Sequence, residues 1–193
     1  MTHVPKIPKQ ARGEFAEIFA SMEAQTGFLP GSLEVMAHRP AILRGFMALT
    51  GAVLGPGCVA HELKLLVAYV ASTAAGCRYC QAHTGSHGAK IGIREEKLQH
   101  AHEFETHPAF SAEERAALRL ARDGALQPNA VDASHYSALR KHFSEEQIVE
   151  LVAVISIYGF LNRWNDTLAT QLEAPPRRFA ESHLPGWSVG KHA

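Results

Sequence analysis

The sequence has no surplus of either charge, only three cysteines and no long apolar run, and each shortage excludes a class of protein. Lys plus Arg and Asp plus Glu both number 19, so the formal net charge is zero. A chain without a basic surplus lacks the electrostatic footprint that binding to phosphate backbones requires. We therefore expect no nucleic-acid partner.

Segments typical of membrane insertion or export are also missing. The longest apolar stretch, residues 65–76, is interrupted by two hydroxyl residues and is too short to span a bilayer. Residues 1–12 contain two prolines and lack the apolar region of a signal peptide. These features predict a cytoplasmic protein without a membrane partner. Three cysteines, an odd number, then favour catalytic or metal-binding thiols over a structural disulfide framework.

Strand-like alternation is nearly absent, and apolar residues recur instead at the spacing of helices. One such stripe consists of Leu63, Leu66, Val67 and Val70. Capping boxes, in which a Ser and a Glu or Gln three residues later satisfy free backbone donors, predict helices that begin after Ser111 and Ser144. The sequence therefore predicts an all-α fold.

The length and composition predict one domain. A chain of 193 residues with 46% apolar side chains is sufficient for a single hydrophobic core. We expect one helical domain over residues 1–174, with its core at about 40–173, and a Pro-rich extended arm over 175–193. Helix breaks are expected at 27–31, 55–57, Gly76, Gly92, Pro108, 127–129 and 175–176.

The second half of the chain echoes the first at a shift of 85 residues. The shift places Cys77-Arg-Tyr-Cys80 over Asn162-Arg-Trp-Asn165, and Leu66-Val67-Ala68 over Leu151-Val152-Ala153. Chance alignment of helical segments is the alternative, but the shared Arg-aromatic pair favours a diverged duplication. We expect a helix, a break and a four-residue turn in both copies.

The reactive residues are concentrated in residues 76–87, which read Gly-Cys-Arg-Tyr-Cys-Gln-Ala-His-Thr-Gly-Ser-His. Gly76 predicts a break that places Cys77 at the start of a helix, where the free N-terminus stabilises a thiolate. Cys80 and His83 then follow along one side of that helix, and His87 lies one turn further. A thiolate can cleave a peroxide, a nearby histidine can supply the proton, and the second thiol converts the sulfenic acid to a disulfide.

Other interpretations of this segment remain open. The two cysteines and two histidines could bind zinc, although one helix face cannot surround an ion tetrahedrally. The cysteines could also be ordinary buried apolar residues. Cys58 has no partner nearby in sequence, and we predict no role for it.

With these residues in view, the chain resembles the alkylhydroperoxidase D and carboxymuconolactone decarboxylase superfamily, especially its peroxidase-related branch. The resemblance extends from about Pro40 to Glu173 and is most specific at residues 76–84. It implies an all-helical fold assembled as a homo-oligomer, such as a dimer, trimer or hexamer. It also implies that Cys80 attacks the peroxide and Cys77 resolves the sulfenate.

The proton relay that the resemblance implies is not matched at its usual positions. The family histidine most often lies four residues after the second cysteine, where this chain has Thr84, so His83 is turned by about 100° and His87 is a second candidate. The family glutamate lies where this chain has Leu65, and Glu62, one turn earlier, is the substitute candidate. Glu150, which occupies the equivalent position in the second copy, is a further candidate if copies or subunits face one another.

These observations predict a thiol-dependent peroxidase of the alkyl hydroperoxide reductase type, which acts on a hydroperoxide and contains no metal, haem or flavin cofactor. A dithiol donor, either a thioredoxin-like or a lipoyl-bearing protein, would reset the Cys77–Cys80 pair. The alternatives are a carboxymuconolactone decarboxylase-like enzyme, and a non-catalytic helical oligomer with redox-sensing thiols.

Overall fold

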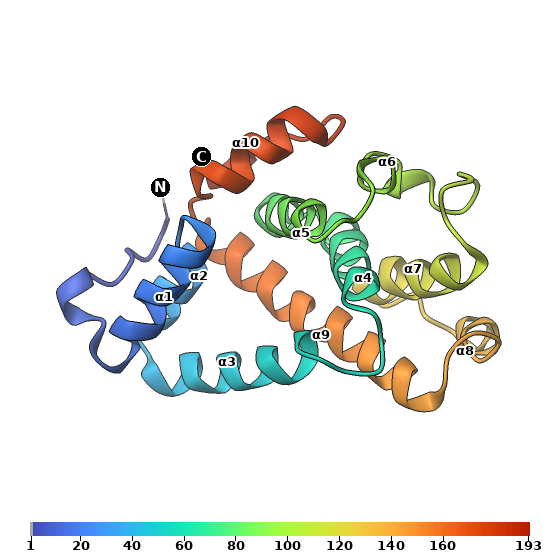
Figure 1. The fold of residues 1–193 in the computed structure, drawn as a ribbon, viewed down its shortest axis with the longest axis horizontal. Coiled ribbons are helices and arrows are strands. Elements are labelled where there is room, and N and C mark those ends of the chain that lie inside the picture. Colours follow the sequence, from blue (N-terminus) through green and yellow to red (C-terminus); the bar gives the residue numbers. More distant parts are fainter. Residues whose placement is uncertain (1) are drawn as a thin grey trace.

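The computed structural model describes residues 2–193, which form helices and connecting loops without a β-strand (Figure 1). The predicted all-α fold is confirmed. The α-helices are α1 (Ala16–Thr26), α2 (Gly31–Met36), α3 (Pro40–Leu54), α4 (His61–Ala74), α5 (Arg78–Lys90), α6 (Glu95–Gln99), α7 (Ala112–Ala125), α8 (Ala133–Leu139), α9 (Glu145–Leu168) and α10 (Ala174–His183). Short 3₁₀ turns occur at η1 (Lys9–Ala11), η2 (Gly13–Phe15), η3 (Ala101–Glu103) and η4 (Gly190–His192).

The main core lies where α4, α5, α7 and α9 pack together (Figure 1). Helix α4 is buried almost all round, from Lys64 to Ser72, because neighbours cover it on several sides. A smaller apolar cluster formed by the N-terminal helices holds α1 and α2 near the end of α9. No helix among residues 2–193 has the length and apolar character needed to cross a membrane.

Both predicted capping boxes are present. The Ser111 hydroxyl accepts from the backbone of Glu114 at 3.1 Å, and the Glu114 carboxylate accepts from the backbone of Ser111 at 2.9 Å. Ser144 and Gln147 make the same reciprocal pair at the start of α9. These caps satisfy backbone donors that would otherwise be free, so they fix where α7 and α9 begin.

Helices α4 and α5 form an antiparallel hairpin that positions the cysteines. Gly76 adopts a φ of 76°, a left-handed conformation that favours glycine, and it reverses the chain after α4. Cys77 then has extended backbone as the N-cap of α5. The predicted break at Gly76 and the predicted helix start at Cys77 are both confirmed.

The segment from Pro175 onward is not the extended arm that we expected. Residues 174–183 form α10, with Pro175 and Pro176 in its first turn, where a proline needs no backbone donor and suits the helical φ. Helix α10 packs on α5, and a Cβ at Gly85 would meet Phe179 at 3.3 Å. The chain then returns toward α9, where η4 places His192 in the interior.

The second copy of the proposed repeat also differs from our expectation. Helix α9 runs without interruption from Glu145 to Leu168, so no break precedes the Asn162-Arg-Trp-Asn165 segment. Leu161 occupies the position that corresponds to Gly76 at a shift of 85, and a leucine does not favour the left-handed turn. The duplication stays a prediction, while the long α9 carries both asparagines against the core.

Candidate functional site

Cys77 and Cys80 lie at the start of α5, beneath the surface. Their exposed fractions are 0% and 3%, and both are free thiols. The backbone nitrogen of Cys80 donates to the sulfur of Cys77 at 3.5 Å, so the Cys77 side chain caps the helix. Partial positive charge at a helix N-terminus stabilises an anion there, and this placement therefore favours negative charge on Cys77.

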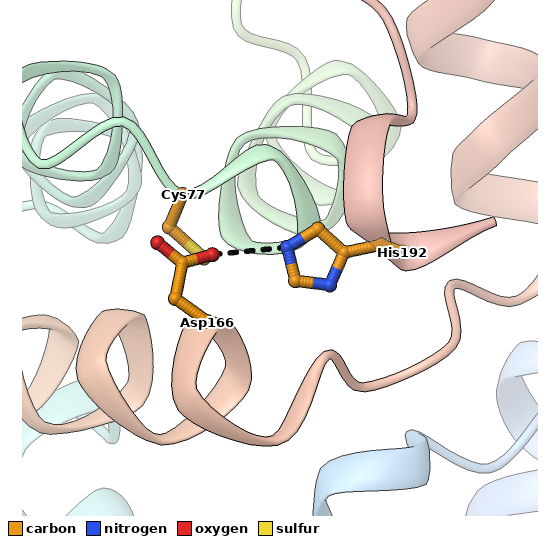
Figure 2. Close-up of side chains that lie close together, drawn as sticks. All are labelled: Cys77, Asp166 and His192. Carbon is orange, nitrogen blue, oxygen red and sulfur yellow. Dashed lines mark hydrogen bonds and ion pairs between the residues drawn. The ribbon is translucent and has the colours of Figure 1, made fainter. Parts of the chain in front are cut away.

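Asp166 and His192 meet Cys77 from two other elements (Figure 2). The Cys77 sulfur, an Asp166 carboxylate oxygen and a His192 ring nitrogen all lie within 4.8 Å of one another. Asp166 comes from the last turn of α9 and His192 from η4, so three distant parts of the chain converge here.

The hydrogen bonds of His192 favour its protonated form. Its Nδ1 lies 2.8 Å from the backbone oxygen of Thr170, and its Nε2 lies 3.0 Å from Oδ1 of Asp166. A carbonyl oxygen and a carboxylate accept hydrogen bonds, so the protonated ring, which donates from both nitrogens, satisfies both partners. Burial lowers its pKa, but the hydrogen bonds to Cys77 and Thr170 and the contact with Asp166 outweigh burial and raise it.

The two thiols have opposite acidities. The hydrogen bond from Cys80, together with His192, lowers the pKa of Cys77 to about 6 although burial opposes the shift. Burial and the neighbouring Cys77 sulfur raise the pKa of Cys80 well above its usual range. The surroundings therefore favour the thiolate on Cys77 and the neutral thiol on Cys80.

Asn165 of α9 contacts the second thiol. Its Nδ2 donates to the Cys80 sulfur at 3.5 Å, and Asn165 itself is fully buried. The donor opposes part of the effect of burial on the pKa of Cys80. Cys80 and Asn165, which the 85-residue shift aligned, are thus in direct contact.

His83 lies within a second hydrogen-bonded group on α5. Its Nε2 is 2.7 Å from Oε2 of Glu173, and its ring stacks on Tyr79 with centroids 4.4 Å apart. The Tyr79 hydroxyl donates to the same carboxylate at 3.1 Å, as does the backbone of Gly31 at 2.5 Å. Burial raises the pKa of Glu173, but these contacts, chiefly with His83, outweigh burial and lower it. Glu173 therefore stays ionised and orients the His83 ring.

Glu62 and His87 lie at the opposite end of the α4–α5 hairpin from the thiols. Glu62 is in the first turn of α4, near Gly92, and the His87 ring contacts His61 with centroids 5.7 Å apart. His87 follows Cys80 by seven residues, which is roughly 10 Å along a helix. Because the two helices are antiparallel, both side chains are carried away from the cysteines. Among the three relay candidates on α4 and α5, His83 is the one on the turn that follows Cys80.

Glu150 is bound elsewhere in the same chain. It forms an ion pair with the buried Lys64, and its Oε2 accepts from the backbone and the sulfur of Cys58 at 2.8 and 2.7 Å. Fifteen residues of α9 separate Glu150 from Asn165, roughly 22 Å along the helix. Glu150 therefore cannot reach Cys80 of its own chain. It anchors the loop between α3 and α4 to α9.

Cys77, Asp166 and His192 are also the one group of three metal-type donors found within residues 2–193. The ligands come from three elements, so the geometric objection to a zinc site on a single helix does not apply to them. Both ring nitrogens of His192 already have hydrogen-bond partners, however, in Thr170 and Asp166, so neither is free to bind a metal in this arrangement. The arrangement fits proton and thiolate chemistry as it stands.

Four residues of the site were missed by the sequence analysis as functional candidates: Asn165, Asp166, Glu173 and His192. Asn165 had a signal, since the 85-residue shift placed it over Cys80. Glu173 and His192 had none, because their positions depend on how the chain folds back after α9.

Comparison with known proteins agrees with this architecture. Residues 40–123 match the carboxymuconolactone decarboxylase family. The protein YdfG of Bacillus subtilis (strain 168) is 34% identical over 91 residues, which is 47% of this chain and 60% of YdfG. The protein YnjA of Escherichia coli (strain K12) is 29% identical over 92 residues, 48% of this chain and 50% of YnjA. The matched segments span about three fifths of YdfG and half of YnjA.

Solved structures extend the similarity over nearly the whole chain. The debrominase Bmp8, in a Cys-to-Ala variant bound to 2,3,4-tribromopyrrole, superposes with a TM-score of 0.86 and 32% identity, covering 94% of this chain and 97% of Bmp8. A peroxidase-related protein with an alkylhydroperoxidase D core from Ralstonia eutropha JMP134 has the same fold, with a TM-score of 0.77, 20% identity and coverage of 91% and 94%. The chain belongs to the carboxymuconolactone decarboxylase family and has the fold of alkylhydroperoxidase D-like proteins.

Proposed function

We propose that the chain is a thiol-dependent peroxidase in which Cys80 attacks a hydroperoxide and Cys77 resolves the product. The observation that carries the proposal is the buried thiol pair at the N-terminus of α5, where Cys77 caps the helix and lies beside His192. A helix N-terminus and a neighbouring histidine favour a thiolate, which a nucleophilic cysteine needs and a structural one does not. The assignment of the attacking role to Cys80 follows from the family resemblance.

The shared proton allows Cys80 to react although its own pKa is raised. Transfer of that proton from Cys80 to Cys77 leaves a thiolate on Cys80. This sulfur attacks one peroxide oxygen, the O–O bond breaks, and the departing alkoxide takes a proton and leaves as an alcohol. His83, one turn along α5 and oriented by Glu173, is the group we assign as proton donor. Solvent restores its proton.

Cys77 then completes the cycle within the protein. Its sulfur attacks the Cys80 sulfenic acid, a disulfide forms, and hydroxide leaves as water with the proton that Cys77 carried. Two electrons have moved from the thiols to the peroxide. An external dithiol, a thioredoxin-like or lipoyl-bearing protein, reduces the disulfide and restores the charge on Cys77. The chemistry uses the thiols alone and requires no cofactor.

Reductive dehalogenation is the second candidate function, and the similarity to a debrominase favours it. In that reaction a thiolate takes bromine from carbon, the carbon gains a proton, and the second thiol displaces bromide to form the same disulfide. The electron balance matches that of peroxide reduction. A carboxymuconolactone decarboxylase-like reaction needs no thiols and would survive replacement of both cysteines.

The experiment is thiol titration with mass analysis before and after one equivalent of cumene hydroperoxide. We expect loss of two thiols, a Cys77–Cys80 disulfide, and a sulfenic acid at Cys80 in the Cys77→Ser variant. A parallel incubation with 2,3,4-tribromopyrrole measures bromide release. Bromide release with thiols that resist the peroxide would replace the peroxidase by the dehalogenase. Thiols inert to both reagents would leave a helical protein with non-catalytic cysteines.

A further inference from the structure

A cavity of about 520 Å³ opens between the C-terminal ends of α4 and α7 and the second half of α9. Its wall includes Ala75, two residues before Cys77, and Asp166, whose carboxylate lies within 4.8 Å of the Cys77 sulfur. The volume is that of a typical small-molecule site. Asp166 therefore belongs both to the cavity wall and to the group of side chains around Cys77.

Asn162 in the cavity wall has unused hydrogen-bonding capacity. It is 4% exposed, and neither its amide nitrogen nor its amide oxygen has a partner within residues 2–193. Buried amides are almost always paired, so both atoms are available to a ligand that enters here. By the 85-residue shift, Asn162 is also the counterpart of Cys77.

The charge that the cavity offers to a ligand is positive. Arg163 lines it and makes no ion pair among the described residues. The negative charge of Asp166 is already directed to His192, and Asp123, next to the lining residue Gly124, is paired with Arg122 and His135. Arg163 is therefore the uncompensated charge at the mouth of the cavity.

We propose that this cavity is the substrate site and that it selects organic hydroperoxides bearing a carboxylate, which Arg163 binds while Asn162 hydrogen-bonds the polar end near the thiols. The inference rests on the proposed function and narrows its substrate class. The planar guanidinium matches a carboxylate with two parallel hydrogen bonds. Small and apolar side chains such as Leu126 and Ile155 cover the remaining carbon skeleton.

The test compares cumene hydroperoxide with its para-carboxylate, two oxidants that differ by one carboxylate group. We expect kcat/KM to favour the carboxylate roughly tenfold in the unmodified protein, the effect of one charge-assisted hydrogen-bonded pair. Arg163→Met should remove this preference, chiefly by raising KM for the carboxylate. Arg44→Met, the same change on the surface of α3, should preserve the preference.

A binding measurement separates this inference from the peroxidase itself. Calorimetry with 4-isopropylbenzoate, which cannot be reduced, should show binding that Arg163→Met and Asn162→Leu each weaken several-fold. Binding unchanged by both substitutions, or equal rates for the two peroxides, would overturn the substrate site. If neither peroxide is reduced but 4-isopropylbenzoate binds as expected, the peroxidase proposal is wrong and the carboxylate-binding site is supported.

Discussion

The amide nitrogen of Asn165 lies 3.5 Å from the sulfur of Cys80, although 85 residues separate them in sequence. This contact joins the long helix α9 to the first turn of α5, inside a region from which solvent is excluded. An N–H donor in that environment stabilises a negative sulfur more than a neutral one. The position of Asn165 therefore favours the thiolate form of Cys80.

Replacement of Asn165 by leucine should slow the first reaction step. Leucine has a similar size but donates no hydrogen bond, so the Cys80 thiolate loses one stabilising partner, and we expect roughly fivefold to tenfold slower thiol loss. The measurement is single-turnover oxidation by cumene hydroperoxide, followed by thiol titration. Asn129→Leu, the same change in an exposed loop, is the control. An unchanged rate in Asn165→Leu would contradict a role for this contact.

Removal of the His192 charge should raise the pKa of Cys77. We expect His192→Gln to shift it from about 6 toward the ordinary value for a thiol, roughly 8.5, because glutamine keeps a donor but no charge. Above its pKa Cys77 is a thiolate, so between pH 6 and 8 the variant should lose thiolate absorbance that the unmodified protein retains.

The absorbance measurement does not require a reagent to reach the buried sulfur. Cys77→Ser identifies which part of the signal belongs to Cys77, and His183→Gln on α10 tests an unrelated histidine. If the titration curve of Cys77 is the same in His192→Gln, His192 does not stabilise the Cys77 thiolate.

Much of this site could be predicted from local sequence. Gly76 reverses the chain because it adopts a left-handed φ, and Cys77 becomes an N-cap as a direct result. The start of α9 followed from a capping box at Ser144. Such features depend on interactions within a few residues, and those interactions are the same in most folds.

The remaining partners depend on how distant segments return to one another. His192 reaches Cys77 because α10 packs on α5 and η4 turns back to α9, and no local pattern encodes that path. Pro175 was misleading for a related reason, since a proline ends a helix but also suits the start of one. Glu62 and His87 share helix faces that the antiparallel hairpin places far from the thiols.

The His83–Glu173 pair should control proton delivery. His83→Gln and Glu173→Gln are each expected to slow oxidation of the thiols by roughly a hundredfold, since one removes the proton carrier and the other its orienting charge. His87→Gln, at the far end of the same helix, should react at the original rate. Stopped-flow oxidation across pH 5 to 9 measures all three. If His87→Gln slowed thiol oxidation as much as His83→Gln, the result would contradict the assignment of His83 as the proton donor.

The buried pair of Lys64 and Glu150 should dominate stability rather than catalysis. The Lys64 side chain is 1% exposed and also donates to the backbone oxygens of Val53 and Gly55 at 3.0 and 2.8 Å. Lys64→Met leaves the Glu150 carboxylate without its cation, and removal of one partner of a buried pair costs about 3–5 kcal/mol of unfolding free energy. Urea denaturation followed by circular dichroism measures the loss.

The same pair should make the free energy of unfolding fall as the pH is lowered. Burial opposes ionisation of Glu150, but the contacts with Cys58 and Lys64 outweigh burial and lower its pKa to about 2. A carboxyl whose pKa is lowered by folding contributes its full stabilisation above its unfolded pKa of roughly 4.3, and that contribution disappears as the pH falls toward 2. Glu150→Gln should therefore be less stable near pH 7 and should lose less stability on acidification.

Two comparisons decide whether the ion pair is the cause. Arg177→Met breaks a partly exposed pair with Glu181 and should cost no more than about 1 kcal/mol. The double variant Lys64→Met with Glu150→Gln removes both charges, so it should be less destabilised than the sum of the two single changes. Strict additivity would show that Lys64 and Glu150 act separately and that each is held by its backbone contacts alone.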